Sequence, residues 1–270
     1  MDNVRSRRNA LVTRFRNAAH ARRPDRTTLL LDGVRLIRDA CAAGAPIVAA
    51  IVSQAALAAG DGGVERLARD LEAAGVPVAS GSDSVMEAVS PVRAPSAAVA
   101  LGDHRPASLD AVLDAATDDC GCVLAPAGVQ DPGNLGAIVR TAEAAGAAGV
   151  AVSGASADPF GWKALRGAMG STFRLPVADG VAPAEVVEAA RRSGFRVLAA
   201  VPRGGCPLHE ADLEGRRLVL VGAEGTGLSP VAALADAAIS VPMAPPVESL
   251  NVAVAAGVIL YEARRRRTLP

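Results

Sequence analysis

Short apolar runs alternate with amphipathic stretches along the first hundred residues. Apolar positions at helical spacing, with arginines between them, predict a basic amphipathic helix over residues 9–23. Residues 27–44 read as a strand, a turn at Asp32 and Gly33, and a helix. The remaining elements are strands over 46–53, 76–80 and 96–101 and helices over 64–75 and 82–91. This pattern is typical of a compact α/β unit.

The second half of the chain alternates between strand and helix again. Strands are expected over 122–128, 149–154, 196–202, 216–225 and 237–243, and helices over 134–146, 162–171, 183–194, 229–236 and from Ser249 onward. Such alternation predicts a parallel sheet covered on both faces. Ligands of such sheets bind beyond the carboxyl ends of the strands, which directs attention to the loops 126–134, 201–206, 222–229 and 242–251. A stretch rich in turn residues and acidic residues places the domain boundary near residue 106, giving domains 1–105 and 106–270.

Composition narrows the setting in which the protein works. Half of the 270 residues are hydrophobic, but no apolar run reaches the roughly 18 residues of a membrane helix. The N-terminal segment has charges without a following apolar stretch, so no secretory signal is expected and a cytoplasmic location follows. The four cysteines form no CxxC pair and have no histidine at ligand spacing, which favours reduced thiols over a metal site.

Charge is concentrated at the two ends of a chain whose net charge is zero. Residues 1–26 contain eight arginines, and residues 264–267 are four consecutive arginines. Basic ends on a neutral protein indicate an anionic partner, RNA or DNA. The alternative is a pair of solvated tails.

Three polar segments interrupt the apolar pattern of the second half, and the first is "GVQDPGNLGAIVRTAEAAG", residues 128–146. Pro132 and Gly133 predict a turn, after which Asn134 can cap the helix with its side-chain oxygen. Arg140 is a charge within an otherwise apolar stretch of that helix. Read alone, this arginine is either functional or a side chain that extends to solvent.

The second polar segment, "LVLVGAEGTGLSP", places a glycine-rich turn after a buried strand. Glu224 lies inside this turn and would repel a pyrophosphate, which argues against a bound dinucleotide or ATP. The third segment is "PPVESLNVAVAAG", residues 245–257. Ser249 is expected to cap the last helix, but that leaves Asn251 unexplained, because asparagine is unfavourable inside a helix unless its amide has a partner.

Taken together, these three segments resemble the signature segments of the SpoU (TrmH-type) branch of the SPOUT RNA methyltransferases, in the same order. The first half resembles, more weakly, the L30e-like substrate-binding domain that often precedes them. In "LLLDGVRLI" Asp32 stands where the family usually has glutamate. The resemblance implies a parallel-sheet methyltransferase domain with a C-terminal trefoil knot, paired as a homodimer, behind a smaller N-terminal α/β domain that binds RNA.

The resemblance also implies an S-adenosylmethionine site and a set of catalytic residues. The cofactor would be wrapped by Leu198, Ala199, Ala200, Gly222, Ala223, Glu224, Gly225, Val241, Met243, Ser249 and Leu250. The catalytic set would be Asn134, Arg140, Glu224, Ser249 and Asn251, with no metal. Arg140 would hold the ribose or its phosphate, the two asparagines would orient it, and Glu224 would pair with it or anchor its loop.

The reaction implied is methyl transfer to a ribose 2′-hydroxyl of structured RNA. Ribosomal RNA is the expected substrate, and transfer RNA is the alternative. Two further hypotheses are an inactive homologue that only binds RNA and a dinucleotide-dependent oxidoreductase. The carboxylate in the glycine-rich turn and the missing GxGxxG motif count against the oxidoreductase.

Overall fold

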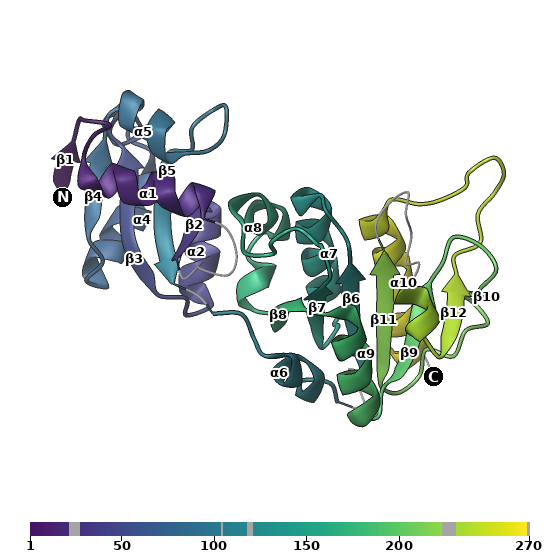
Figure 1. Cartoon of the computed structure of the whole chain (residues 1–270). Coiled ribbons are helices and arrows are strands. Elements are labelled where there is room, and N and C mark those ends of the chain that lie inside the picture. The colour runs from purple at the N-terminus through teal and green to yellow at the C-terminus, as the bar shows by residue number, and fades with distance from the viewer. Residues whose placement is uncertain (22–27, 104, 118–120, 223–230, 269–270) are drawn as a thin grey trace. The chain divides into compact units, whose positions relative to one another are not determined.

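The structure is a computed structural model, and it describes residues 1–21, 28–103, 105–117, 121–222 and 231–268. The chain forms two compact units (Figure 1). One unit contains residues 1–105 and 160–173, and the other contains residues 106–159 and 174–270. The sequence pattern groups residues 160–173 with the second half, whereas in the structure they pack with the first. Among the described residues, no helix has the length and apolar character needed to cross a bilayer.

The first unit is built on a mixed five-stranded sheet in the order β1-β4-β3-β5-β2. Its strands are β1 (Asp2–Val4), β2 (Thr28–Asp32), β3 (Ile47–Ser53), β4 (Val78–Gly81) and β5 (Ala98–Asp103). β5 runs antiparallel to both of its neighbours, and the other pairs are parallel. The unit therefore belongs to the α/β class that the sequence predicts. The short β1 was not predicted.

Helices cover the sheet of the first unit. They are α1 (Ala10–His20), α2 (Val34–Ala42), α3 (Gln54–Ala58), α4 (Gly62–Ala73) and α5 (Asp83–Val89), with α8 (Trp162–Ala168) and the short 3₁₀ helix η1 (Ser171–Phe173) from the later segment. Phe15 of α1 is completely buried in the core, and Trp162 of α8 packs against the same core. The turn between β2 and α2 requires Gly33, whose φ of 111° is unfavourable for other residues.

The second unit contains a seven-stranded sheet in the order β10-β12-β9-β11-β6-β7-β8, and each pair in it is parallel. Its strands are β6 (Cys122–Ala127), β7 (Gly149–Ser153), β8 (Val177–Val181), β9 (Arg196–Ala200), β10 (Cys206–Pro207), β11 (Arg217–Gly222) and β12 (Ala237–Ser240). The predicted parallel sheet is confirmed. β8 and β10 were not predicted.

The sheet of the second unit is buried on both faces, which explains its nearly continuous apolar strands. Helices α6 (Leu109–Asp114) and α9 (Pro183–Arg192) share a core with one face, through side chains such as Val123 and Leu218. Helix α7 (Pro132–Ala144) packs on β7, and α10 (Val252–Thr268) packs on β6 and β11. The helix expected over 229–236 is wrong in type, because its described part forms a short 3₁₀ helix, η2 (Val231–Leu234).

Candidate functional site

The carboxyl ends of four neighbouring strands meet at one edge of the parallel sheet. Gly222 at the end of β11 is paired with Ala127 at the end of β6, and Ile239 of β12 is paired with Ala200 at the end of β9. The backbone N–H of Val201 continues this pairing by donating to the carbonyl of Ile239 at 2.9 Å. The residues expected around a cofactor therefore come from adjacent strands.

The expected cofactor residues on β9 differ in how they can be reached. Leu198 and Ala199 are buried, with exposed fractions of 2% and 0%, and Ala199 belongs to the core shared with α6 and α9. Ala200 is half-buried and is the last residue of β9, so it lies at the edge of the sheet. A ligand at this edge can contact Ala200 directly, but it can approach Leu198 and Ala199 only from beyond the end of the strand. Three further candidates, Ala223, Glu224 and Gly225, lie outside the described residues.

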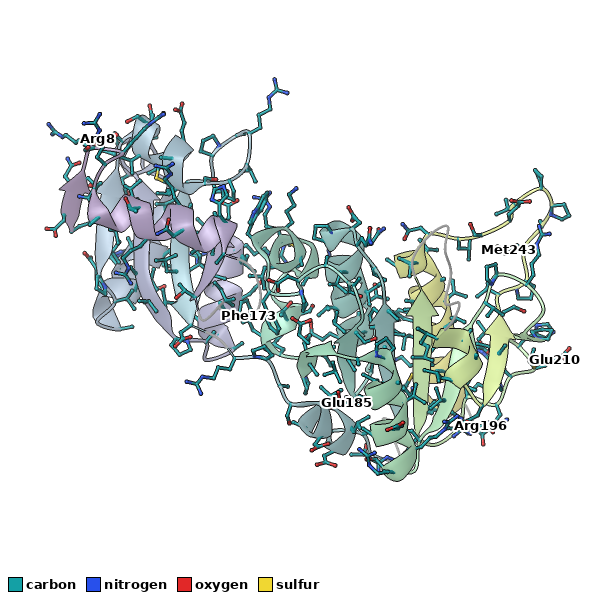
Figure 2. The ribbon with its side chains drawn as sticks, in the orientation of Figure 1. Arg8, Phe173, Glu185, Arg196, Glu210 and Met243 are labelled. Carbon is teal, nitrogen blue, oxygen red and sulfur yellow. The ribbon has the colours of Figure 1, made fainter. Side chains whose placement is uncertain are left out.

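The segment between β12 and α10 begins at the same edge of the sheet, where β12 ends. Figure 2 labels Met243 in this segment, which leaves the sheet after β12. Val241, Met243 and Leu250 are half-buried, and Ser249 is exposed. The segment thus presents partly covered apolar side chains together with a hydroxyl.

Asn251, and not Ser249, caps helix α10. Its side-chain Oδ1 accepts hydrogen bonds from the backbone N–H of Ala253 at 2.9 Å and of Val254 at 3.3 Å, and its carbonyl accepts from Ala255. The predicted cap at Ser249 is wrong because α10 begins at Val252, too far along for the Ser249 hydroxyl to serve its first turn. Ser249 is left exposed on the preceding segment.

Asp131, and not Asn134, caps helix α7. The Oδ1 atom of Asp131 accepts from the backbone N–H of Asn134 at 2.7 Å, and Pro132 occupies the first turn. The predicted cap at Asn134 is wrong because proline is favourable at the first helical position, so the helix starts two residues earlier. The sequence contained a signal for this cap, since Asp131 directly precedes Pro132. The sequence analysis missed Asp131, which caps the helix that carries Asn134.

The cap at Asp131 leaves the side chain of Asn134 able to contact the last helix. Its Oδ1 accepts a hydrogen bond from Asn251 Nδ2 at 3.0 Å, across 117 residues of sequence. Because Oδ1 of Asn251 faces two backbone N–H groups, its Nδ2 must be the atom that faces Asn134. The first and third signature segments are therefore joined by a hydrogen bond of defined direction.

Helices α7 and α10 contact each other at two further levels. A Cβ placed on Gly257 would lie 3.2 Å from Cγ2 of Thr141, and Arg264 Nη1 donates to the carbonyl of Ala144 at 2.7 Å. Residue numbers rise together from the asparagine pair to Arg264, so the two helices run in the same direction. This packing fixes the position of Asn251 relative to Asn134.

Arg140 lies on the same helix as Asn134 but on a different face of it. Six residues separate them, which corresponds to about 9 Å along the axis and roughly 120° around it. Arg140 is exposed, and its guanidinium has no hydrogen bond or ion pair with another described residue. Its expected partner Glu224 lies outside the described residues. The structure thus joins Asn134 to Asn251 and leaves Arg140 and Ser249 open to solvent.

Asp236 secures the strand that leads to the cofactor edge. Its Oδ2 accepts from the backbone N–H of Val197 at 2.8 Å, and its Oδ1 accepts from Arg191 at 2.6 Å. The hydrogen bond from Val197 and the neighbouring guanidinium lower the pKa of Asp236, which keeps it ionised as an acceptor. The sequence analysis missed this anchor of β9.

Comparisons with known proteins agree with this geometry. Residues 121–261 match the SpoU rRNA Methylase family. A 23S rRNA (uridine(2479)-2′-O)-methyltransferase of Streptomyces viridochromogenes is 42% identical over 142 residues, which are 50% of this chain and 50% of the relative. A 23S rRNA (guanosine(2553)-2′-O)-methyltransferase of Bacillus subtilis is 41% identical over 139 residues, 50% of this chain and 55% of the relative.

The structural likeness extends further along the chain than the sequence matches. The AdoMet-bound rRNA methyltransferase of Sinorhizobium meliloti superposes with a TM-score of 0.84 and 29% identity, covering 100% of this chain and 99% of the other. The chain spans about half the length of the curated relatives it matches. On the match over residues 121–261, this chain belongs to the SpoU rRNA methylase family.

Proposed function

We propose that this protein is an S-adenosylmethionine-dependent methyltransferase that acts on a ribose 2′-hydroxyl of ribosomal RNA. The hydrogen bond between Asn134 and Asn251 carries the proposal, because it joins two family signatures beside the strand ends where a cofactor is expected. Two relatives with a named target nucleotide act on 23S rRNA, which favours ribosomal RNA over transfer RNA. Such a substrate implies a cytoplasmic location.

The residues at the carboxyl edge of the sheet fit S-adenosylmethionine. Small residues end two adjacent strands at Ala200 and Gly222, and half-buried Val241, Met243 and Leu250 offer apolar contact to an adenine ring. When bound, the cofactor supplies an electrophilic methyl group. The proposal adds Ala223, Glu224 and Gly225 to these cofactor-binding residues. It also includes a trefoil knot that brings the 241–250 segment to the cofactor.

The catalytic work assigned to this chain is positioning and electrostatics. The target hydroxyl must lie in line with the reacting methyl, so orientation supplies much of the rate. Asn251 orients Asn134, which faces the ribose, and Ser249 donates near the ribose or the cofactor. Arg140 holds the ribose or its phosphate and stabilises negative charge on the oxygen, because a guanidinium keeps its proton and is a poor base.

A homodimer belongs to the proposal because α10 has an exposed apolar stripe. Val254, Val258 and Tyr261 are exposed by 53%, 40% and 50%, and they follow one another at intervals of four and three residues. Side chains at this spacing lie on one face of a helix. A second copy that covers this face would shelter the stripe and approach the exposed residues of α7 and the 241–250 segment.

RNA binding is assigned to the first unit, of the L30e-like type, on the basis of its charge. Arg5, Arg8, Arg14 and Arg16 are exposed and have no ion pair with another described residue. The C-terminal arginines are used internally, since Arg266 donates to the carbonyl of Leu208 at 2.9 Å and also to that of Ala211. The basic N-terminus is therefore the better candidate for RNA phosphates.

Replacing Arg140 tests the proposed chemistry. We expect Arg140→Ala to lower single-turnover methyl transfer to a 23S rRNA transcript by about 10²–10³, as for loss of one preorganised charge contact. Arg140→Lys should restore little, because lysine keeps the charge and loses the planar fork. Cofactor affinity, measured by calorimetry on the same proteins, should change far less than the rate.

The matched control is Arg192→Ala, which removes an exposed arginine from α9 on the other face of the sheet. It should leave transfer within a few-fold of the parent. Near-normal turnover in Arg140→Ala would defeat the assignment of Arg140. A loss accounted for entirely by weaker cofactor binding would move Arg140 to the cofactor site.

A further inference from the structure

A cavity of about 190 Å³ lies within the first unit. It opens beside the first turn of α2 and is bounded by the end of β2, by α2 and by α8. Each of its lining residues belongs to the first unit, so the cavity is a property of that unit alone.

One wall of the cavity is an arginine held by a buried carboxylate. The side chain of Asp32 is completely buried, and its Oδ2 accepts from Arg166 Nη1 while its Oδ1 accepts from Ser90 Oγ at 2.9 Å. The Arg166 side chain is 42% exposed. A guanidinium has five N–H donors, so Asp32 fixes the orientation of Arg166 and leaves most of its donors for another group.

Two further lining residues are a cation and an anion that do not pair with each other. Arg35 and Asp39 lie one turn apart on α2, and neither side chain has a hydrogen bond or ion pair with another described residue. Leu36 and Met169 add apolar surface. Met169 ends α8 in the left-handed conformation of a helix C-cap, with φ 50°.

The chemistry of this lining selects a class of ligand. The charges of Arg35 and Arg166 are balanced by those of Asp39 and Asp32, so the cavity is not a strong anion site. It offers donors, an acceptor and apolar contact together. A nucleobase presents the complementary features on its edges and faces, and unpaired RNA bases are commonly bound by stacking and edge recognition.

We propose that this cavity binds an unpaired nucleobase of the substrate RNA, with Arg35 and Arg166 as donors and Asp39 as acceptor. The proposal rests on the assignment of RNA as substrate. The proposal further identifies this cavity as the place where the first unit recognises the sequence or shape of the RNA. Bases in duplex stems are stacked and paired, so the site selects a loop or bulge.

Asp39→Ala tests the proposal through the sign of its effect. If the first unit attracts RNA only by charge, removing a carboxylate should tighten binding to a polyanion. If Asp39 accepts from a base, the same change should weaken binding of a 23S rRNA transcript by about tenfold, the typical scale of one good base contact. The matched control is Asp70→Ala, which removes an exposed carboxylate of α4 that does not line the cavity.

Arg35→Ala separates a base contact from a phosphate contact. We expect weaker RNA binding with an unchanged slope of log affinity against log salt, because a base contact releases no phosphate counterion. Arg69→Ala on α4 is the control of equal charge. Arg166→Ala is a poorer test, since it leaves Asp32 buried without its cation and endangers the fold.

The outcomes are distinct for the full-length protein in filter binding. Tighter binding by Asp39→Ala, equal to that of Asp70→Ala, overturns the base site. A slope flatter by about 0.7–0.9 in Arg35→Ala makes Arg35 a phosphate contact and also overturns it. If the parent binds the 23S rRNA transcript no better than a poly(U) homopolymer, the proposed ribosomal substrate fails instead.

Discussion

The side chain of Asn251 serves two purposes with its two ends. Its oxygen caps α10, and its nitrogen holds Asn134 at 3.0 Å. Stability and positioning are therefore carried by different atoms of one residue. A substitution that keeps only one of the two functions can tell them apart.

Asn251→Ser should retain the cap and lose the contact with Asn134, because a serine oxygen caps a helix about as well as asparagine but is too short to reach α7. We expect a melting temperature close to that of the parent and methyl transfer lowered by at least tenfold. Asn251→Ala should lose both functions and cost about 1 kcal/mol of unfolding free energy. Parent-like transfer in Asn251→Ser would show that the asparagine contact is not needed.

At the scale of residues, the sequence predicted the two asparagines as site residues but not the contacts that they make. Asp131, Asn134, Ser249 and Asn251 are all good N-cap residues, and they occur in two pairs within three residues of each other. The local pattern cannot choose between such neighbours. The choice depends on where each helix starts once α7 and α10 have packed together.

Helices α7 and α10 approach closely because Gly257 faces Thr141. A Cβ at Gly257 would lie 3.2 Å from Thr141 Cγ2, closer than ordinary van der Waals contact. We expect Gly257→Val to destabilise the protein by about 1–3 kcal/mol through overpacking. Urea denaturation measures this change.

Thr141→Ser provides the matched control, since it removes the Cγ2 atom in question. Combined with Gly257→Val, it should recover part of the lost stability. If the double variant is no more stable than the sum of the two single changes predicts, the two helices do not touch as described.

The C-terminal part of α10 is held by a cluster around Glu262. Its carboxylate accepts from Arg265 and Arg266 at 2.8–2.9 Å, and Arg266 in turn reaches the carbonyls of Leu208 and Ala211. Hydrogen bonds from Arg265 and Arg266 lower the pKa of Glu262 from 4.5 to about 2. The folded state is therefore favoured by ionised Glu262.

Because this pKa is depressed, the stabilisation is present above pH 4.5 and is lost as the pH falls toward 2. Glu262→Gln should flatten the decline of the urea midpoint over that range. Glu188→Gln, at an exposed glutamate of α9, should not. If the urea midpoint declines identically in the parent and in Glu262→Gln, the cluster does not contribute to stability in acid.

At the scale of elements, continuous apolar runs made β6, β9 and β11 predictable, since strands buried on both faces have no polar alternation. In β8, Asp179 and Gly180 interrupt the run and conceal the strand. β10 has two residues and no pattern to detect. The 3₁₀ helix at Val231–Leu234 was likewise predicted incorrectly, because four residues are too few for the apolar spacing to distinguish it from an α-helix.

At the scale of the whole molecule, the exposed stripe of α10 predicts the state of assembly. Val258→Glu places a charge in the middle of the stripe and should convert a dimer into a monomer at micromolar concentration in sedimentation velocity. Val48→Glu, at a valine exposed by 37% in the first unit, should leave the dimer intact. A parent protein that sediments as a monomer would contradict the dimer directly.

The α/β class and the parallel sheet followed from the pattern of the chain, but the membership of residues 160–173 in the first unit did not. Local sequence gives α8 a helical period and no sign of which core it joins. That choice depends on Asp32, whose buried carboxylate requires a cation, and on Trp162, which packs against the first core. Both are contacts between residues far apart in sequence.

This late segment has a consequence during translation. Arg166 is made 134 residues after Asp32. At about 5–20 residues per second, roughly 7 to 27 s separate the two as the nascent chain grows. During that time the first unit lacks α8, the cation for Asp32 and part of its core. The ribosome will have made β6, α7 and β7 before the N-terminal unit can close, so the part synthesised first finishes folding only after the second unit has begun.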